Sequence, residues 1–154
     1  MKKILVLFTL IFALGAVGCS SKDKVKDIPV EDIKAAINNE NLLPLQPLSE
    51  VDAKEFYVFE NIKDNITEGF ALQAMINIKL QDVFVVKTDD VEKVKQAIED
   101  YKKNALNMLA NGYGGPENAE AVSNSILESK GNYVYFIATP NAKDIESKIL
   151  EVIE

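Results

Sequence analysis

The chain has 154 residues, with 17 lysines, 24 carboxylates, no histidine, no arginine and a single cysteine. Without histidine it cannot build a Ser-His-Asp triad, a Cys-His pair or a histidine-ligated zinc site. With one cysteine it has no intramolecular disulfide and no thiolate metal cage. The net charge of −7 argues against nucleic acid, because the phosphates would be repelled. We therefore expect no cofactor, no metal site and no nucleic-acid partner.

The first 18 residues have the pattern of a secretory signal peptide. A cationic start, Met1 to Lys3, precedes an apolar run over residues 4–14, which is too short to span a membrane in the mature protein. Cleavage between Gly18 and Cys19 would make the only cysteine the first mature residue. The sequence Ala16-Val17-Gly18-Cys19 resembles the bacterial lipoprotein lipobox, with Ala16 where leucine is usual. We predict a diacylglyceryl group on Cys19 that anchors the protein to the extracytoplasmic face of the cell membrane.

The mature chain would keep 15 lysines and 24 carboxylates, a net charge of −9. Residues 19–28 are polar and charged without apolar periodicity, which predicts a flexible tether. Residues 29–154 are long enough for a single domain with a buried core. Because an anionic surface weakly repels an acidic body, we expect this domain to hang from its tether rather than lie on the membrane.

The first part of the domain is expected to be helical. Pro29 precedes apolar residues at helical spacing, which predicts a helix ending near Asn38 and Asn39. Residues 41–47 form a proline-punctuated connector. Ser49 is a favourable N-cap and predicts a second, short helix through about residue 60, although the aromatic residues there also suit a strand.

The middle of the chain changes to the period of strands. Apolar and polar residues alternate over 74–80, as in a half-buried strand. The continuous apolar run 83–86 suits a central strand that is buried on both faces. Asp89 and Glu92 have capping-box spacing at the start of a long amphipathic helix, which is predicted to end at residues 111–112.

The last third predicts a hairpin between two helices. Residues 117–124 are typical of a short helix, and residues 125–129 and 132–139 are typical of two strands joined by a tight turn. Thr139 followed by Pro140 predicts the start of the last helix, since proline suits its first position.

The two hairpin-helix segments align at an offset of 51 residues, with Val83 on Val134 and Thr88 on Thr139. An internal repeat would explain this alignment, and so would the general likeness of any two strand-threonine-helix segments. We predict an α+β domain of two layers, in which two ββα units form about four mainly antiparallel strands. Helices would cover one face, and the N-terminal helices would precede the units.

Three segments of the domain resemble a known protein family. They are the strand pair Ala74-Met75-Ile76-Asn77-Ile78 and Asp82-Val83-Phe84-Val85-Val86-Lys87, the loop Gly112-Tyr113-Gly114-Gly115-Pro116-Glu117-Asn118-Ala119, and the hairpin Lys130-Gly131-Asn132-Tyr133-Val134-Tyr135-Phe136. Through them the chain from about Ile28 onward is similar to the bacterial lipoproteins of domain-of-unknown-function 4358. The resemblance implies a lipid-anchored domain outside the cytoplasmic membrane of low-GC bacteria, and it implies no particular activity.

The glycine-rich loop is the strongest candidate for a ligand site. It supplies Tyr113, Gly114 and Gly115, to which Tyr133 and Tyr135 of the following hairpin are added. Glycines let a backbone approach a ligand, and tyrosines offer a stacking face and a hydroxyl, which suits sugars or peptides. The alternative is a helix C-cap and turn, with Tyr113 packed back onto the domain. No residue is singled out as catalytic.

We expect a non-enzymatic binding or interaction module at the cell envelope, with an envelope protein or a small ligand as partner. The alternative is a cell-wall glycan enzyme, or an accessory to one, that uses two carboxylates about 5–9 Å apart. A third option is a structural spacer, which would have neither a cleft nor an exposed apolar patch. An apolar cleft without a carboxylate pair would favour binding.

Overall fold

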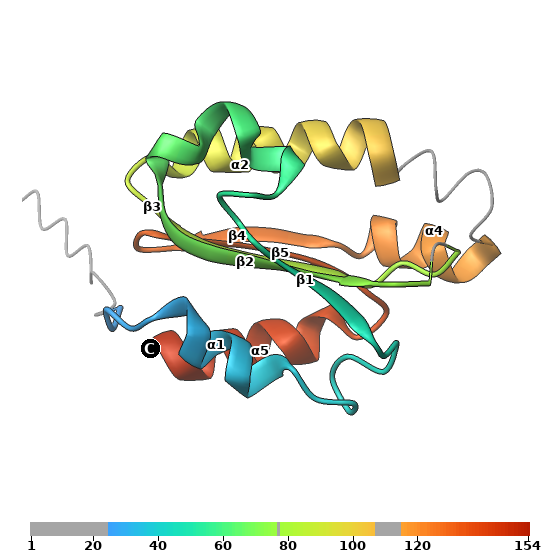
Figure 1. The fold of residues 1–154 in the computed structure, drawn as a ribbon. Helices are drawn as coiled ribbons and strands as arrows, with labels where there is room; N and C mark the ends of the chain where they lie inside the picture. The colour runs from blue at the N-terminus through green and yellow to red at the C-terminus, as the bar shows by residue number, and fades with distance from the viewer. Residues whose placement is uncertain (1–24, 77, 107–114) are drawn as a thin grey trace, which may run out of the picture.

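The computed structural model describes residues 25–76, 78–106 and 115–154, which fold around one antiparallel sheet (Figure 1). The sheet has five strands in the order β1-β2-β3-β5-β4, and every neighbouring pair is antiparallel. Its strands are β1 (Leu48–Asp52), β2 (Ile66–Ala74), β3 (Asp82–Thr88), β4 (Ile126–Lys130) and β5 (Tyr133–Ala138). β3 is therefore the central strand, and β1 and β4 are the edges.

Helices cover both faces of this sheet (Figure 1). α1 (Val30–Ile37) and α5 (Ala142–Ile153) lie side by side on one face, which we call the α1/α5 face. The 3-10 helix η1 (Tyr57–Asn65) and α2 (Val91–Tyr101) lie on the other, the α2 face. α2 continues into the π-helical turn η2 (Lys102–Leu106), and α4 (Gly115–Ser123) lies at one end of the sheet.

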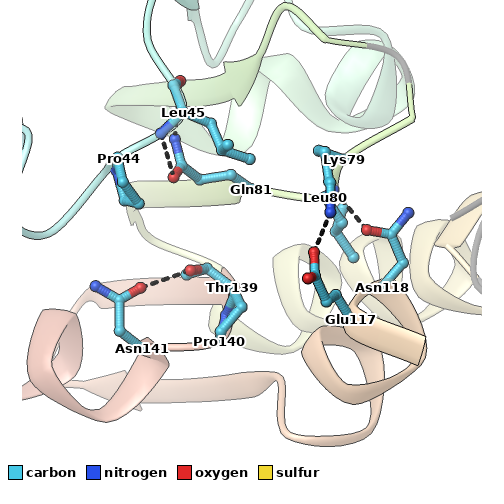
Figure 2. Close-up of a pocket in the computed structure, with 10 residues that line it drawn as sticks. All are labelled: Pro44, Leu45, Lys79, Leu80, Gln81, Glu117, Asn118, Thr139, Pro140 and Asn141. Carbon is cyan, nitrogen blue, oxygen red and sulfur yellow. Dashed lines mark hydrogen bonds and ion pairs between the residues drawn. The ribbon is translucent and has the colours of Figure 1, made fainter. Parts of the chain in front are cut away.

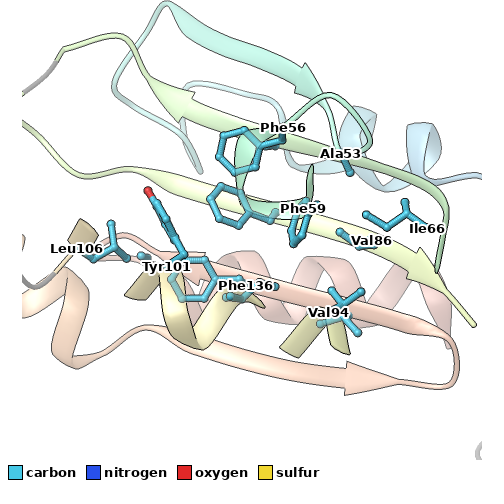
Figure 3. Close-up of a cluster of buried hydrophobic side chains, with 14 of the residues drawn as sticks. Ala53, Phe56, Phe59, Ile66, Val86, Val94, Tyr101, Leu106 and Phe136 are labelled. Atoms are coloured by element: carbon cyan, nitrogen blue, oxygen red, sulfur yellow. The ribbon is translucent and has the colours of Figure 1, made fainter. Parts of the chain in front are cut away.

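The core of the α2 face is rich in aromatic rings (Figure 3). The ring of Phe84 lies at its centre, with its centroid 4.9 Å from that of Phe56, 5.5 Å from that of Tyr101 and 5.4 Å from that of Phe136. Such offset and edge-on pairs add about 0.5–1.5 kcal/mol each beyond the burial of their area. This cluster fixes α2 and η1 against the strands β3 and β5.

The core of the α1/α5 face is mainly aliphatic, and β3 contributes to both cores. Val83 and Val85 point to the α1/α5 face, while Phe84 and Val86 point to the α2 face. Side chains alternate along a strand, so a strand that is apolar at every position must be covered on both sides. The prediction of a doubly buried central strand over 83–86 is confirmed.

The α+β class and the antiparallel sheet are as predicted, the predicted number of strands is only roughly right, and the predicted single helical layer is wrong. The sheet has five strands instead of about four, and helices cover both faces instead of one. The reason lies in β3 and β5, whose side chains are almost all buried. A single helical layer would have left half of these apolar side chains in water.

Two local predictions are also corrected. Residues 48–52, which overlap the predicted second helix, form the edge strand β1, and a 3-10 helix follows only from Tyr57. The strand predicted over 74–80 is largely the loop between β2 and β3, where Ile76 and Ile78 are 44% and 57% exposed. Their alternation therefore marks exposed apolar residues and not a buried strand face.

The two hairpin-helix segments occur in the predicted order, but they are not equivalent in space. α2 and α5 lie on opposite faces, so Val83 and its counterpart Val134 enter opposite cores. The hairpins also differ in register, because Val83 pairs with Leu72 while Val134 pairs with Ser129. In a structural repeat, the two partner residues would also be 51 positions apart. Leu72 and Ser129 are 57 positions apart, so the two segments are alike only in their sequence pattern.

Residues 25–28, predicted as the end of the flexible tether, lie against the domain. The Tyr133 hydroxyl accepts a hydrogen bond from the Ile28 amide at 2.8 Å and donates one to the Ile28 carbonyl at 2.7 Å. The Lys26 amide donates to the carbonyl of Ile153 at 2.8 Å, and Asp27 forms an ion pair with Lys87. The first described residues and the end of α5 therefore meet beside the β4–β5 turn, at what we call the terminal end of the sheet (Figure 1).

The predicted signal peptide, the Gly18–Cys19 cleavage site and residues 19–24 of the tether lie outside the described residues. Among the helices that the structure describes, none is long and apolar enough to cross a membrane.

Candidate binding site at the cavity end of the sheet

Two adjacent cavities lie at the end of the sheet opposite the terminal end, which we call the cavity end. The first has a volume of about 460 Å³ and is lined by three segments and α4 (Figure 2). The connector before β1 supplies Pro44 and Leu45, and the loop before β3 supplies residues 79–81. The turn between β5 and α5 supplies residues 139–141. Parts of the chain far apart in sequence thus converge on this cavity.

Buried side-chain amides hold the walls of the first cavity together. The Gln81 carboxamide accepts a hydrogen bond from the Leu45 amide at 3.1 Å and donates one to the Leu45 carbonyl at 3.2 Å. Asn118 of α4 accepts from the Leu80 amide at 2.9 Å and donates to the Ile78 carbonyl at 3.1 Å. Both side chains are almost fully buried. They act as bridges between backbone segments, so the cavity is preformed.

The turn on the far side of the cavity is held in the same way. The Thr139 hydroxyl donates to the Asn141 side-chain oxygen at 2.6 Å, and the Asn141 amide donates to the Leu42 carbonyl at 2.6 Å. No buried side-chain nitrogen or oxygen in the described part of the chain lacks a hydrogen-bond partner. The wall amides are thus engaged mainly with the protein backbone, and the lining that remains for a ligand is mainly apolar: Pro44, Leu45, Leu80 and Pro140.

Charge is confined to the rim of the first cavity. Lys79 and Glu117 line it and form an ion pair with each other, and both side chains are substantially exposed. Glu117 is the one carboxylate among the described lining residues. An apolar interior with a polar rim is the usual composition of a small-ligand or side-chain pocket.

The second cavity shares Lys79 and Leu80 with the first and has a volume of about 500 Å³. It is lined by the first residue of β3, Asp82, which is only 4% exposed. The Tyr101 hydroxyl donates to Asp82 Oδ2 at 2.6 Å, and the Gln73 amide donates to Asp82 Oδ1 at 3.2 Å. A buried carboxyl group thus faces a cavity at the edge of the aromatic core.

Burial governs the acid-base behaviour of this group. It raises the pKa of Asp82 to about 6, although the hydrogen bonds from Tyr101 and Gln73 act in the opposite direction. Burial also raises the pKa of Tyr101 far above its usual range, and the nearby Asp82 charge adds to this effect. At neutral pH, Asp82 is mainly ionised and Tyr101 is a neutral donor.

Exposed apolar side chains lie on the β2–β3 loop, where Met75 and Ile76 line the second cavity. Met75, Ile76 and Ile78 of the β2–β3 loop are 60%, 44% and 57% exposed, and they belong to the small set of large apolar side chains exposed in the described chain. Clustered apolar exposure of this kind marks an interaction surface more often than chance.

Within the described residues, no group of three or more histidine, cysteine, aspartate or glutamate side chains could hold a metal ion.

The predicted ligand residues are not brought together around these cavities. Tyr113 and Gly114 lie outside the described residues, and Gly115 begins α4 with a φ of 66°. Tyr133 is fully buried and bonds to Ile28 at the terminal end. Tyr135 is also buried, and its hydroxyl donates to Glu146 of α5 at 3.1 Å. Both tyrosines therefore have roles within the α1/α5 face.

Sequence reasoning missed Gln81, Asp82 and Asn118. It singled out none of them as a site residue and placed the third in a short helix. The available signal was weak: Gln81 and Asp82 directly precede an apolar strand, where a polar side chain can be drawn into the interior. The hydrogen-bond partners of these three side chains lie at least nine positions away in the sequence. The local sequence pattern could therefore not predict these contacts.

These features define a small α+β domain in which an antiparallel sheet lies between helical layers and carries preformed cavities at one end. The chain belongs to the family described as a domain of unknown function, DUF4358, whose model matches residues 38–139. This match confirms the family resemblance seen in the sequence and covers all five strands. No curated protein and no solved structure matches the chain.

Proposed function

We propose that this protein is an extracytoplasmic lipoprotein, anchored through Cys19, whose domain is a non-enzymatic binding module at the cell envelope. The observation that carries the binding role is the preformed, mainly apolar cavity of about 460 Å³ at one end of the sheet. The exposed apolar residues Met75 and Ile76, which line the adjacent second cavity, support a binding role over that of a spacer.

The anchor is supported by the N-terminal sequence. A cationic start, a short apolar run and the small residues before Cys19 are the parts of a lipoprotein signal. A single acyl chain would bind a membrane only marginally, whereas the two chains of a diacylglyceryl group give stable attachment at about 0.8 kcal/mol per buried methylene. The docked residues 25–28 leave only residues 20–24 between the lipid and the domain.

The carboxylates support binding over glycan hydrolysis. Each cavity is lined by one described carboxylate: Glu117 in the first, which is paired with Lys79, and Asp82 in the second. Hydrolysis of a glycosidic bond usually needs an acid and a second carboxylate on either side of the same bond. Neither cavity offers that arrangement.

The anchor is tested with a Cys19→Ser variant expressed beside the wild-type protein. We expect the wild type to fractionate with membranes and to carry the mass of a diacylglyceryl group, and the variant to lose both properties. Membrane association of the variant, without any loss of lipid mass relative to the wild type, would contradict the anchor.

The binding role is tested by photo-crosslinking in intact cells. A photoreactive residue at Pro44, on the rim of the first cavity, is compared with one at Asn132, an exposed position at the terminal end. We expect a specific adduct from position 44 that is absent from position 132. Identical adducts at both positions, or none at position 44, would count against a binding role for the cavity end.

A further inference from the structure

Asp82 is an unusual group to find at the edge of a cavity. It is the first residue of β3 and is almost fully buried, yet it lines the second cavity together with Tyr101 and Leu106. Both of its hydrogen-bond donors, the Tyr101 hydroxyl and the Gln73 amide, are neutral groups. Neutral hydrogen-bond donors therefore stabilise this carboxylate, but they do not neutralise its negative charge.

The one lysine among the described lining residues of this cavity is already engaged. Lys79 lines both cavities, but its ammonium group forms an ion pair with Glu117 of α4. No ion pair is recorded for Asp82 among the described residues, whereas Glu50 and Glu68 each have a lysine partner. A buried ionised carboxylate without a cation carries a desolvation cost that a cationic ligand would offset.

Part of the remaining lining suits an alkyl group. Met75, Ile76, Leu80 and Leu106 line the cavity beside the polar Ser49 and Gln73, and the Met75 and Ile76 side chains are partly exposed. A ligand that placed its charged end at Asp82 would therefore lay its carbon chain along apolar side chains. Such amphipathic groups, like the lysine side chain, keep an ammonium at the tip of an apolar stem.

We propose that the second cavity binds an ammonium group carried on an apolar chain, with the Asp82 carboxylate as its ion-pair partner and Tyr101 and Gln73 as positioning residues. The ammonium would come from a free amine or from a lysine side chain of a partner. This assignment deepens the binding role proposed above, to which it adds the ligand class, and it does not depend on the lipid anchor.

The pH dependence of such binding follows from the groups around Asp82. Tyr101 and Tyr57 face it from α2 and η1 as neutral hydroxyls whose pKa values are raised, and Lys79 and Glu117 lie at the mouth as a pair. Because burial raises the pKa of Asp82 to about 6, the carboxylate is ionised at pH 7.5 and mostly protonated at pH 5. Ammonium affinity should therefore fall below pH 6.

The probe is hexylammonium chloride, with hexan-1-ol as the neutral control, titrated calorimetrically into the chain carrying Cys19→Ser. A hydrogen bond to a charged group contributes about 1.5–3 kcal/mol, so we expect hexylammonium to bind roughly 10- to 100-fold more tightly than hexanol at pH 7.5. Asp82→Asn should abolish this preference, and Asp64→Asn, the same change at an exposed position of η1 outside both cavities, should retain it. Equal binding of the two probes, binding of neither, or a preference that survives Asp82→Asn would overturn the proposal.

Two further measurements keep the test decisive if Asp82→Asn does not fold. In the wild-type domain, the ¹³C resonance of the Asp82 carboxyl reports its own titration, and hexylammonium should lower its pKa by about one unit for each tenfold preference for the ionised form. An unchanged titration would again overturn the proposal. A blocked lysine dipeptide tests the source: binding by both probes indicates a lysine side chain, and binding by hexylammonium alone indicates a free amine.

Failure of the proposed ammonium ligand is distinguishable from failure of the proposed binding role. If hexylammonium does not bind but the specific crosslink at position 44 is present, the ligand class is wrong and the binding module stands. If neither is observed, both proposals are lost.

Discussion

Gly69 shows how closely the chain packs at a single residue. This glycine of β2 pairs with Val86, and a Cβ built on it would lie 2.7 Å from the Ala53 Cβ and 2.8 Å from the Val85 carbonyl oxygen. Neither neighbour is the flexible end of a long side chain, so neither can turn aside. The segment between β1 and η1 therefore crosses β2 at a distance that only glycine permits.

A Gly69→Ala substitution is expected to lower the free energy of unfolding by about 1–3 kcal/mol, because the backbone of β3 or the segment at Ala53 must move. Chemical denaturation measures this loss. Ala53→Gly combined with Gly69→Ala should recover part of it, since one of the two close contacts is then removed, and Ala53→Gly alone provides the baseline. A Gly69→Ala protein as stable as the wild type would show that the crossing is looser than described.

Asp82 gives stability an unusual dependence on pH. Its pKa in the folded state, about 6, is higher than the 3.8 of an unperturbed aspartate. Between these pH values the folded state retains a proton that the unfolded state has released. The contribution of Asp82 to the free energy of unfolding is therefore fully present at low pH and is lost as the pH rises through about 6.

We expect the wild type to lose on the order of 3 kcal/mol relative to an Asp82→Asn variant between pH 4 and pH 7, because asparagine cannot ionise. Urea unfolding of both proteins across this range measures the difference. Asp64→Asn, at an exposed position of η1, is the control and should follow the wild type at every pH. A constant difference between wild type and Asp82→Asn would mean that the carboxyl is better solvated than its burial indicates.

Among the elements, the N-terminal segment 25–28 differs most from its predicted behaviour. It has no regular secondary structure, yet its backbone is bound by Tyr133 of β5 and by the last turn of α5. Val25 also packs on Gly131, whose φ of 60° shapes the β4–β5 turn. These contacts involve residues more than a hundred positions apart, so no local pattern could reveal them.

Tyr133→Phe should release this segment, because it removes the hydroxyl that both accepts from and donates to Ile28. We expect a loss of about 1–3 kcal/mol and faster hydrogen exchange at the amides of Lys26 and Ile28. Tyr135→Phe is the matched control, since that hydroxyl bonds to Glu146 instead. Equal acceleration at Ile28 in both variants would show that Tyr133 does not hold the segment.

The elements that could be predicted from sequence are those whose pattern reflects burial. Val94, Ile98 and Tyr101 recur at helical spacing and are the buried side of α2, and the apolar runs of β3 and β5 are the central strand and one of its two neighbours. The edge strand β1 was missed because Ser49 and Asp52 resemble a helix cap, and its pairing with β2 depends on residues more than fifteen positions away. The site was missed for the same reason. Gln81, Asp82 and Asn118 are ordinary polar residues in the sequence, and their contacts in the fold are with residues distant in the sequence.

For the whole molecule, the two ends of the sheet have different roles. β3 runs from the cavity end at Asp82 to Thr88 near the terminal end, where Lys87 meets Asp27. Seven residues of strand span about 20 Å. If Cys19 carries the anchor, residues 20–24 reach at most about 18 Å. The terminal end then lies near the membrane and the cavities face away from it.

Fluorescent labels should report this orientation on the lipidated protein in vesicles. A dye on Asn132→Cys, at the terminal end, should be quenched strongly by a nitroxide on the lipid headgroups. A dye on Glu120→Cys, on the exposed side of α4, should be quenched weakly. Equal quenching at both positions would mean that the domain tumbles freely or lies on its side.

The backbone hydrogen bond between Lys26 and Ile153 also affects where a tag can be fused to the protein. Because it brings the carboxyl terminus beside the point where the chain enters the domain, anything fused after Glu154 will project from that same end. A fluorescent protein or affinity tag placed there would leave the cavities open. In an anchored protein the same fusion would be crowded against lipid, whereas an insertion in the β2–β3 loop would block the cavities and spare the attachment.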